Sequence, residues 1–110
     1  MSMKAPQIVQ KSSGATITPA VSFAKQLRSG ELLTGTPTVV EQTTSALTLD
    51  NKAKNTATLT LEGESVIANQ AVQFRVAGGT AGNTYSILVT CGTDATPAQT
   101  LEILVRLEVV

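Results

Sequence analysis

The end of the chain shows the feature that most restricts the fold. From Leu101 to Val109 every second residue is apolar, and Glu102, Arg106 and Glu108 occupy positions of the other parity. Successive side chains of a β-strand point to opposite faces, so a period of two is typical of a strand with one face on a core and one face in water. The pattern predicts such a strand over residues 100–110.

The same alternation recurs elsewhere in the chain. Three further segments repeat it, at residues 56–61, 72–76 and 85–91. Runs rich in Gly, Asn, Asp or Pro lie beside them and predict turns, at residues 50–55, 78–83 and 92–97. Turn signals about every eight to twelve residues favour an all-β fold, an antiparallel β-sandwich of about seven or eight strands.

Two segments depart from this pattern. Residues 25–35 mix apolar residues with two glycines and have no strict period, and we expect a short helical turn that ends at Gly30. Residues 1–15, which include Pro6 and Gly14, are expected to form an N-terminal arm or an edge strand. With 110 residues in total, the rest, 16–110, is expected to be a single sandwich domain.

Composition excludes most chemistry. The chain has no His, no Trp and one Cys, and its formal net charge is zero. Without His there is no imidazole base for a Ser or Cys nucleophile, and a closed zinc site lacks its usual ligands. A neutral chain also lacks the positive field that attracts nucleic acid. We therefore expect no catalytic residue, no metal ligand, no cofactor and no nucleic-acid partner.

Cys91 is expected to be a buried, inert thiol, because it shares the parity of Tyr85, Ile87 and Val89. It has no second Cys to pair with, which fits synthesis in a reducing cytoplasm. The first residues contain no apolar stretch typical of a signal peptide, and no apolar run is long enough to span a membrane. The sequence predicts a protein that is not secreted and has no membrane partner.

The segment Gly78-Gly79-Thr80-Ala81-Gly82 has two interpretations. Stacked glycines can turn backbone N–H groups toward a phosphate, but a phosphate loop also needs a following Lys and a helix. Here Asn83, Thr84 and a predicted strand follow instead. We expect a structural corner in which Gly78, Gly79 and Gly82 make the turn.

Tyr85 follows this corner at the start of the penultimate strand. Immunoglobulin-like sandwiches place there a corner tyrosine whose hydroxyl bonds to nearby backbone. The alternative is an ordinary half-buried tyrosine that needs any partner for its hydroxyl. Both interpretations remain open from the sequence.

Four apolar residues are candidates for an interface: Leu27, Leu32, Leu33 and Val110. The three leucines either plug one end of the sandwich or form a contact surface for a neighbouring subunit. Val110 ends an apolar strand with no charged tail, and a free strand edge tends to find a partner.

At residues 78–87 the chain resembles the tailed-phage fiber–tail adaptor proteins. These are short all-β chains with a Gly-Gly-Thr-Ala-Gly-x-x-Tyr stretch, then a strand, a turn with Thr and Gly, and a last alternating strand. The order is similar here, with Tyr85 to Thr90, Cys91-Gly92-Thr93 and Leu101 to Val109. Upstream, residues 21–31 are similar to the family's early strand and Gly-acidic step, with Phe23 and Leu27 where the family usually has tryptophans. The resemblance covers about residues 16–110.

The resemblance implies an immunoglobulin-like virion protein without enzymatic activity that joins fibers to the tail. Its partners would be other tail, fiber or capsid proteins, and it would occur in many copies or as a homo-oligomer in a symmetric assembly. The same architecture also serves as a capsid decoration protein on the phage head, which is the first alternative. A carbohydrate-binding module is a further alternative, although such modules present exposed aromatic rings and this chain has only Phe23, Phe74 and Tyr85.

Overall fold

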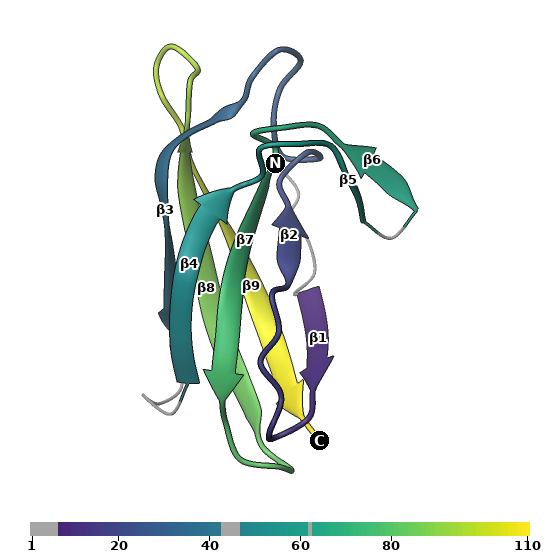
Figure 1. Ribbon diagram of the computed structural model, residues 1–110. Helices are drawn as coiled ribbons and strands as arrows, with labels where there is room; N and C mark the ends of the chain where they lie inside the picture. Colours follow the sequence, from purple (N-terminus) through teal and green to yellow (C-terminus); the bar gives the residue numbers. More distant parts are fainter. Residues whose placement is uncertain (1–6, 43–46, 62) are drawn as a thin grey trace.

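The computed structural model describes residues 7–42, 47–61 and 63–110 (Figure 1). In these ranges it contains strands and turns but no helix, so the all-β prediction is confirmed. The strands are β1 (Gln7–Lys11), β2 (Ala20–Ser22), β3 (Leu33–Glu41), β4 (Leu47–Lys54), β5 (Leu59–Leu61), β6 (Glu64–Val66), β7 (Ala71–Gly78), β8 (Thr84–Thr93) and β9 (Thr100–Val109).

The strands form a β-sandwich. One sheet has four strands in the order β1-β9-β8-β3, and the other has three in the order β2-β7-β4. Strands β5 and β6 form a separate two-stranded hairpin that projects from one end of the sandwich (Figure 1). The molecule measures 42 × 25 × 25 Å, and its long axis follows the strands.

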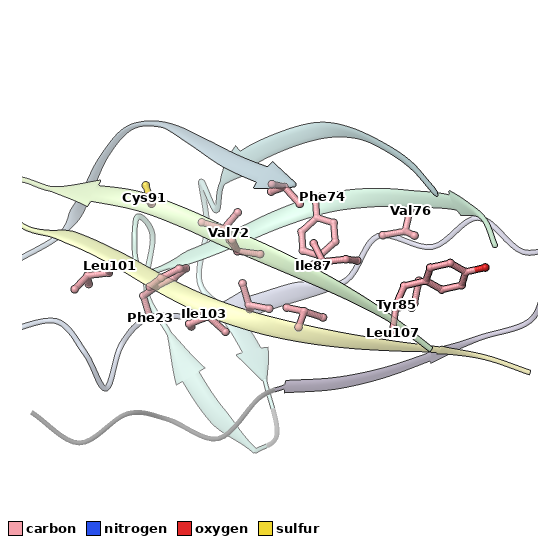
Figure 2. Packing of buried hydrophobic residues seen from close by; sticks show 14 of the residues in the cluster. Phe23, Val72, Phe74, Val76, Tyr85, Ile87, Cys91, Leu101, Ile103 and Leu107 are labelled. Carbon is pink, nitrogen blue, oxygen red and sulfur yellow. The ribbon is translucent and has the colours of Figure 1, made fainter. Parts of the chain in front are cut away.

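Alternation along the long strands places one set of side chains in the core. Every second residue of β8 from Tyr85 and of β9 from Leu101 is buried. They pack against Phe74 and Val76 of the facing sheet and against Phe23, which directly follows β2, and all three are fully buried (Figure 2). Burial of such side chains contributes about 1.5–3 kcal/mol each, so this core is the main source of stability.

Strand β1 is hydrogen-bonded to the edge of the last strand, β9. β1 pairs with β9 in parallel, from Gln7 opposite Val105 to Lys11 opposite Val109. The residues of the expected N-terminal arm or edge strand that the structure describes therefore begin with an edge strand, and residues 1–6 lie outside the described residues. The expectation that the C-terminal strand has a free edge is wrong, because β9 lies between β1 and β8.

The turn expected at residues 50–55 is also wrong. Residues 50–54 continue β4, and a register shift between Asp50 and Ala53 marks a bulge against β7. Asn51 supplies the positive φ of 51° at this bulge. Asp50 accepts two hydrogen bonds from the Arg75 guanidinium, at 2.8 and 2.7 Å. Asn and Asp are favoured at bulges as well as at hairpin turns, and the composition alone does not separate the two.

Residues 23–27 form a single helical turn, as expected, but it ends at Leu27 rather than at Gly30. The amides of Gln26 and Leu27 both donate to the Phe23 carbonyl, at 2.9 and 3.1 Å. A second turn follows, in which the Glu31 amide donates to the Arg28 carbonyl and Gly30 has a φ of 80°. The strand expected at 56–61 is shortened to β5, which pairs with β6.

Candidate interaction surface

The Gly-rich corner between β7 and β8 is fixed by close approach of the backbone to the core. Gly79 has a φ of 94°, and a Cβ built on it would lie 2.9 Å from Val109 Cγ2 and 3.2 Å from Leu47 Cδ2. Such a contact is closer than carbon atoms tolerate, so only glycine fits there without a shift. Gly78 and Gly82 also have positive φ, at 86° and 88°, but nothing lies within 4 Å of a Cβ on Gly82.

Tyr85 ties this corner together. Its hydroxyl accepts a hydrogen bond of 2.9 Å from the Thr80 amide, five residues upstream, while its ring lies in the core (Figure 2). That bond lowers the pKa of Tyr85, with a further contribution from Asn83. The loop also docks on β9, because the Gly82 amide donates to the Val109 carbonyl at 2.8 Å. The predicted corner residues are therefore brought together beside the end of the chain.

Asn55, at the other end of β7, is a structural centre that the sequence interpretation missed. Its side chain is 1 % exposed and donates to the carbonyls of Ala57, Val66 and Ile67, at 3.0, 3.4 and 2.8 Å. Its Oδ1 accepts from the amides of Gln70 and Ala71, at 3.1 and 2.9 Å. This one amide group therefore closes the base of the β5–β6 hairpin. In the sequence Asn55 is one of several turn-type residues, and no local pattern distinguishes it.

Lys11 is a second residue that the sequence did not single out. It is 3 % exposed, and its Nζ donates to the carbonyls of Ser12, Ser13 and Ala15, at 2.8, 3.3 and 2.8 Å. These three acceptors satisfy all three donors of the ammonium group. Lys11 therefore closes the turn that leads from β1 to the other sheet.

Glu31 holds the turn that precedes β3. Its Oε1 accepts a 2.9 Å hydrogen bond from the Arg28 amide, and the residue is 6 % exposed. This bond is the main reason that the pKa of Glu31 is lowered, and the Thr93 hydroxyl contributes in the same direction. The next residue, Leu32, donates its amide to Asp94 Oδ1 at 2.9 Å. The segment is thus attached to the β8–β9 loop through the Asp94 carboxylate and through the Asp94 amide, which donates to the Leu32 carbonyl.

The structure separates the four candidate interface residues. Leu33 is 3 % exposed and belongs to the core, so it offers no contact surface and that part of the expectation is corrected. Leu27 is half-buried and packs on the core, as expected for a plug at the end of the sandwich. Leu32 is half-buried, and Val110 is 64 % exposed beside the corner.

The outer face of the four-stranded sheet carries exposed apolar residues that the sequence analysis did not identify. Val40 lies opposite Leu88, and Leu88 lies opposite Leu104, so the three form a row across β3, β8 and β9. Val40 is 46 % and Leu104 is 37 % exposed, and Leu88 is half-buried. We call these three residues the outer row. The signal for it was present in the sequence as an apolar residue, Leu104, at a position of the polar parity.

Other kinds of site find little support in the described residues. All three aromatic residues of the chain, Phe23, Phe74 and Tyr85, are buried, so no ring face is available to stack on a sugar. Within residues 7–42, 47–61 and 63–110 no group of His, Cys, Asp and Glu is placed to hold a metal ion. Cys91 is buried, and desolvation raises the pKa of its thiol.

Among the described residues no helix has the length and apolar character needed to cross a bilayer. Comparisons with protein-family models, with curated proteins and with solved structures gave no match to this chain.

Proposed function

We propose that the chain is a non-enzymatic structural protein of a bacteriophage particle, an immunoglobulin-like adaptor that joins tail and fiber subunits. The observation that carries the proposal is the geometry of the corner. Gly79 packs against Val109 with no room for a side chain, and the Tyr85 hydroxyl bonds to the Thr80 backbone. These residues belong to the stretch that resembles the fiber–tail adaptor family. Their contacts explain why that stretch needs a glycine and a tyrosine at these two positions.

The strand order supports the immunoglobulin-like part of this proposal. In immunoglobulin domains strands C, F and G share one sheet, and strands B, E and D share the other. Here β3, β8 and β9 match the first set, and β2, β7 and β4 match the second. The hairpin of β5 and β6 is an addition between the strands that match D and E.

The sheet edges support a role in a defined assembly rather than open-ended aggregation. β3 has a register shift between Thr34 and Thr38, with Gly35 at a φ of 77° between them. β4 has its own bulge, at Asp50–Ala53. Bulges at edges prevent unlimited strand addition, so specific partners are expected to bind through faces, loops and the exposed Val110 side chain.

The proposal is tested on particles produced from the genome that encodes this chain. Mass spectrometry of purified particles is expected to find the chain in a fixed ratio to the tail proteins, and a reconstruction is expected to place it at the tail–fiber junction. Density over the capsid surface would instead identify the alternative, a head decoration protein. Particles that lack the chain altogether would overturn both assignments.

A variant tests the contact at the end of the chain. Val110→Asp places a charge on an exposed apolar residue beside the corner, and it is expected to reduce incorporation into particles without unfolding the domain. Thr48→Asp is the matched control, because Thr48 is exposed on the other sheet. Equal incorporation of the two variants would remove Val110 from the interface.

A further inference from the structure

We propose that the outer face of the four-stranded sheet binds a second copy of this chain, face to face, about a two-fold axis that runs along the outer row. The inference concerns the isolated protein in solution, so it holds or fails independently of the role proposed above. It rests on three observations: the strand register that aligns the outer row, the placement of opposite charges on either side of that row, and the exposure of the row to solvent.

Register places the row across the strands. Val40 pairs with Leu88 and Leu88 pairs with Leu104, so the three side chains lie side by side on one line perpendicular to the strand direction. Alternation along β8 and β9 turns them away from the core, because their neighbours Val89, Ile103 and Val105 are buried. A two-fold axis along this line brings each residue of the row onto the same residue of the second copy.

The charges on β9 are complementary under that same operation. A two-fold axis perpendicular to the strands reverses their direction, so a residue two positions before Leu104 faces the residue two positions after Leu104 in the other copy. Those residues are Glu102 and Arg106. Stacking therefore creates two Glu102–Arg106 pairs between the copies, one on each side of the axis.

The two-fold operation brings no like charges together on the neighbouring strand, β8, either. On β8 the positions two residues from Leu88 are Ser86 and Thr90, which are both small, polar and uncharged. On β9 the positions four residues from Leu104 are Thr100 and Glu108, a neutral residue facing an acidic one. Stacking places no two like charges directly opposite each other on β8 or β9.

Within a single copy these charges are not engaged with each other. Arg106 is exposed, and it has no ion-pair partner in the part of the chain that the structure describes. Glu102 accepts a long hydrogen bond of 3.4 Å from the Thr90 hydroxyl. Glu102 and Arg106 are four residues apart on one strand, so they are too distant to pair within a copy. A second copy supplies an opposite charge, which neither side chain has among the described residues of its own copy.

The size of the face sets the expected strength. Four strands about 4.8 Å apart, with about 3.3 Å per residue, give a face of at most roughly 20 × 30 Å, so two stacked faces bury on the order of 1,200 Å² in total. That area lies at the lower limit for stable interfaces. We therefore expect a reversible dimer with a dissociation constant in the micromolar range or weaker.

Charge exchange tests the symmetry directly. Sedimentation equilibrium of the full chain from micromolar to millimolar concentration is expected to show a monomer–dimer equilibrium. Arg106→Glu places two pairs of like charges across the axis and is expected to weaken the dimer by about tenfold. Glu102→Arg is expected to weaken it by a similar factor. The double variant Glu102→Arg/Arg106→Glu restores opposite charges across the axis and is expected to return the dissociation constant to within about threefold of the original.

Two controls separate the interface from general effects. Lys52→Glu changes net charge as Arg106→Glu does, but it lies on β4 in the other sheet, and it is expected to leave the dimer unchanged. Leu104→Ser removes one member of the outer row and is expected to weaken the dimer without lowering the melting temperature, because Leu104 already faces solvent. A wild-type chain that stays monomeric at millimolar concentration would overturn the proposal. So would a double variant as weak as the single ones, because only the two-fold arrangement requires rescue.

Discussion

The Gly-rich corner and the base of the β5–β6 hairpin lie at opposite ends of β7, and both connect strands of the sandwich (Figure 1). The corner is held by close packing, because a Cβ on Gly79 would lie 2.9 Å from Val109 Cγ2 and would force a shift. The hairpin base is held by one polar side chain, because the buried Asn55 amide group satisfies five backbone groups. The difference shows two ways to fix an irregular connection, one steric and one through hydrogen bonds.

The two solutions differ in what a substitution leaves behind. At the corner a larger residue adds strain, but the polar groups of the loop still reach water. At the hairpin base the loss of Asn55 leaves donors and acceptors buried without partners, which costs more than the lost bonds themselves. We therefore expect the hairpin base to be the more sensitive of the two ends.

Asn55→Ala is expected to have the largest effect. It removes all five hydrogen bonds from a site that is 1 % exposed, and a loss of about 3–5 kcal/mol in the free energy of unfolding is expected. Urea unfolding followed by circular dichroism measures it. Asn51→Gly is the matched control, since Asn51 is exposed with a positive φ that glycine accepts, and it is expected to change little. Equal effects at the two asparagines would contradict the role of Asn55.

Gly79→Ala is expected to destabilise by about 2–4 kcal/mol, because its φ is unfavourable for alanine and its Cβ meets Val109. Gly82→Ala separates these causes. Gly82 has a similar φ of 88° but open space around its Cβ, and a loss of only about 1–2 kcal/mol is expected. If thermal unfolding gives the same loss for both, backbone conformation alone explains the corner and the steric account is wrong.

Tyr85→Phe keeps the ring in the core and removes only the hydroxyl that accepts from Thr80. A loss of about 1 kcal/mol in the free energy of unfolding is expected, smaller than at Gly79, because the freed Thr80 amide lies on an exposed loop and can bond to water. Amide exchange at Thr80 is expected to become faster in the same variant. Unchanged exchange would show that the hydroxyl does not order the loop.

Acid is expected to weaken the end of the molecule that holds Glu31 rather than the corner. The pKa of Glu31 is lowered from 4.5 in the folded state, so its contribution is present above that value and is lost as the pH falls through the lower, folded pKa. Melting temperatures measured from pH 7 to pH 3 are expected to fall, and Glu31→Gln is expected to flatten part of that decline. Asp50, whose pKa Arg75 lowers, acts in the same direction. An unchanged decline in the Glu31 variant would contradict its role.

The sequence predicted those parts of the fold that depend on local alternation. The strands expected at 72–76 and 85–91 lie within β7 and β8, and the strand expected at 100–110 is β9, which ends at Val109, because a buried face demands a period of two. The turn expected at 50–55 failed, since the pairing of β4 with β7 continues across a bulge that only the neighbouring strand determines. The pairing of β1 with β9 was also missed. It depends on residues about a hundred positions apart, which no local pattern connects.

The candidate site was predictable only where it carried a local motif. The corner residues stand close together in sequence and include three glycines, so a turn could be expected there. Asn55 acts on backbone groups up to sixteen residues away, and nothing near it indicates this. The outer row joins three strands, and it becomes visible only once their register is known.

The parallel pairing of β1 with β9 has a mechanical consequence. A force that pulls Gln7 and Val110 apart acts along two strands that lie side by side and point the same way, from Gln7 opposite Val105 to Lys11 opposite Val109. The hydrogen bonds between them then carry the load together, in shear, rather than opening one after another. We expect the domain to resist stretching between these two points more strongly than pulling across β3 and β4, and single-molecule force measurements with the two attachment geometries compare these directions.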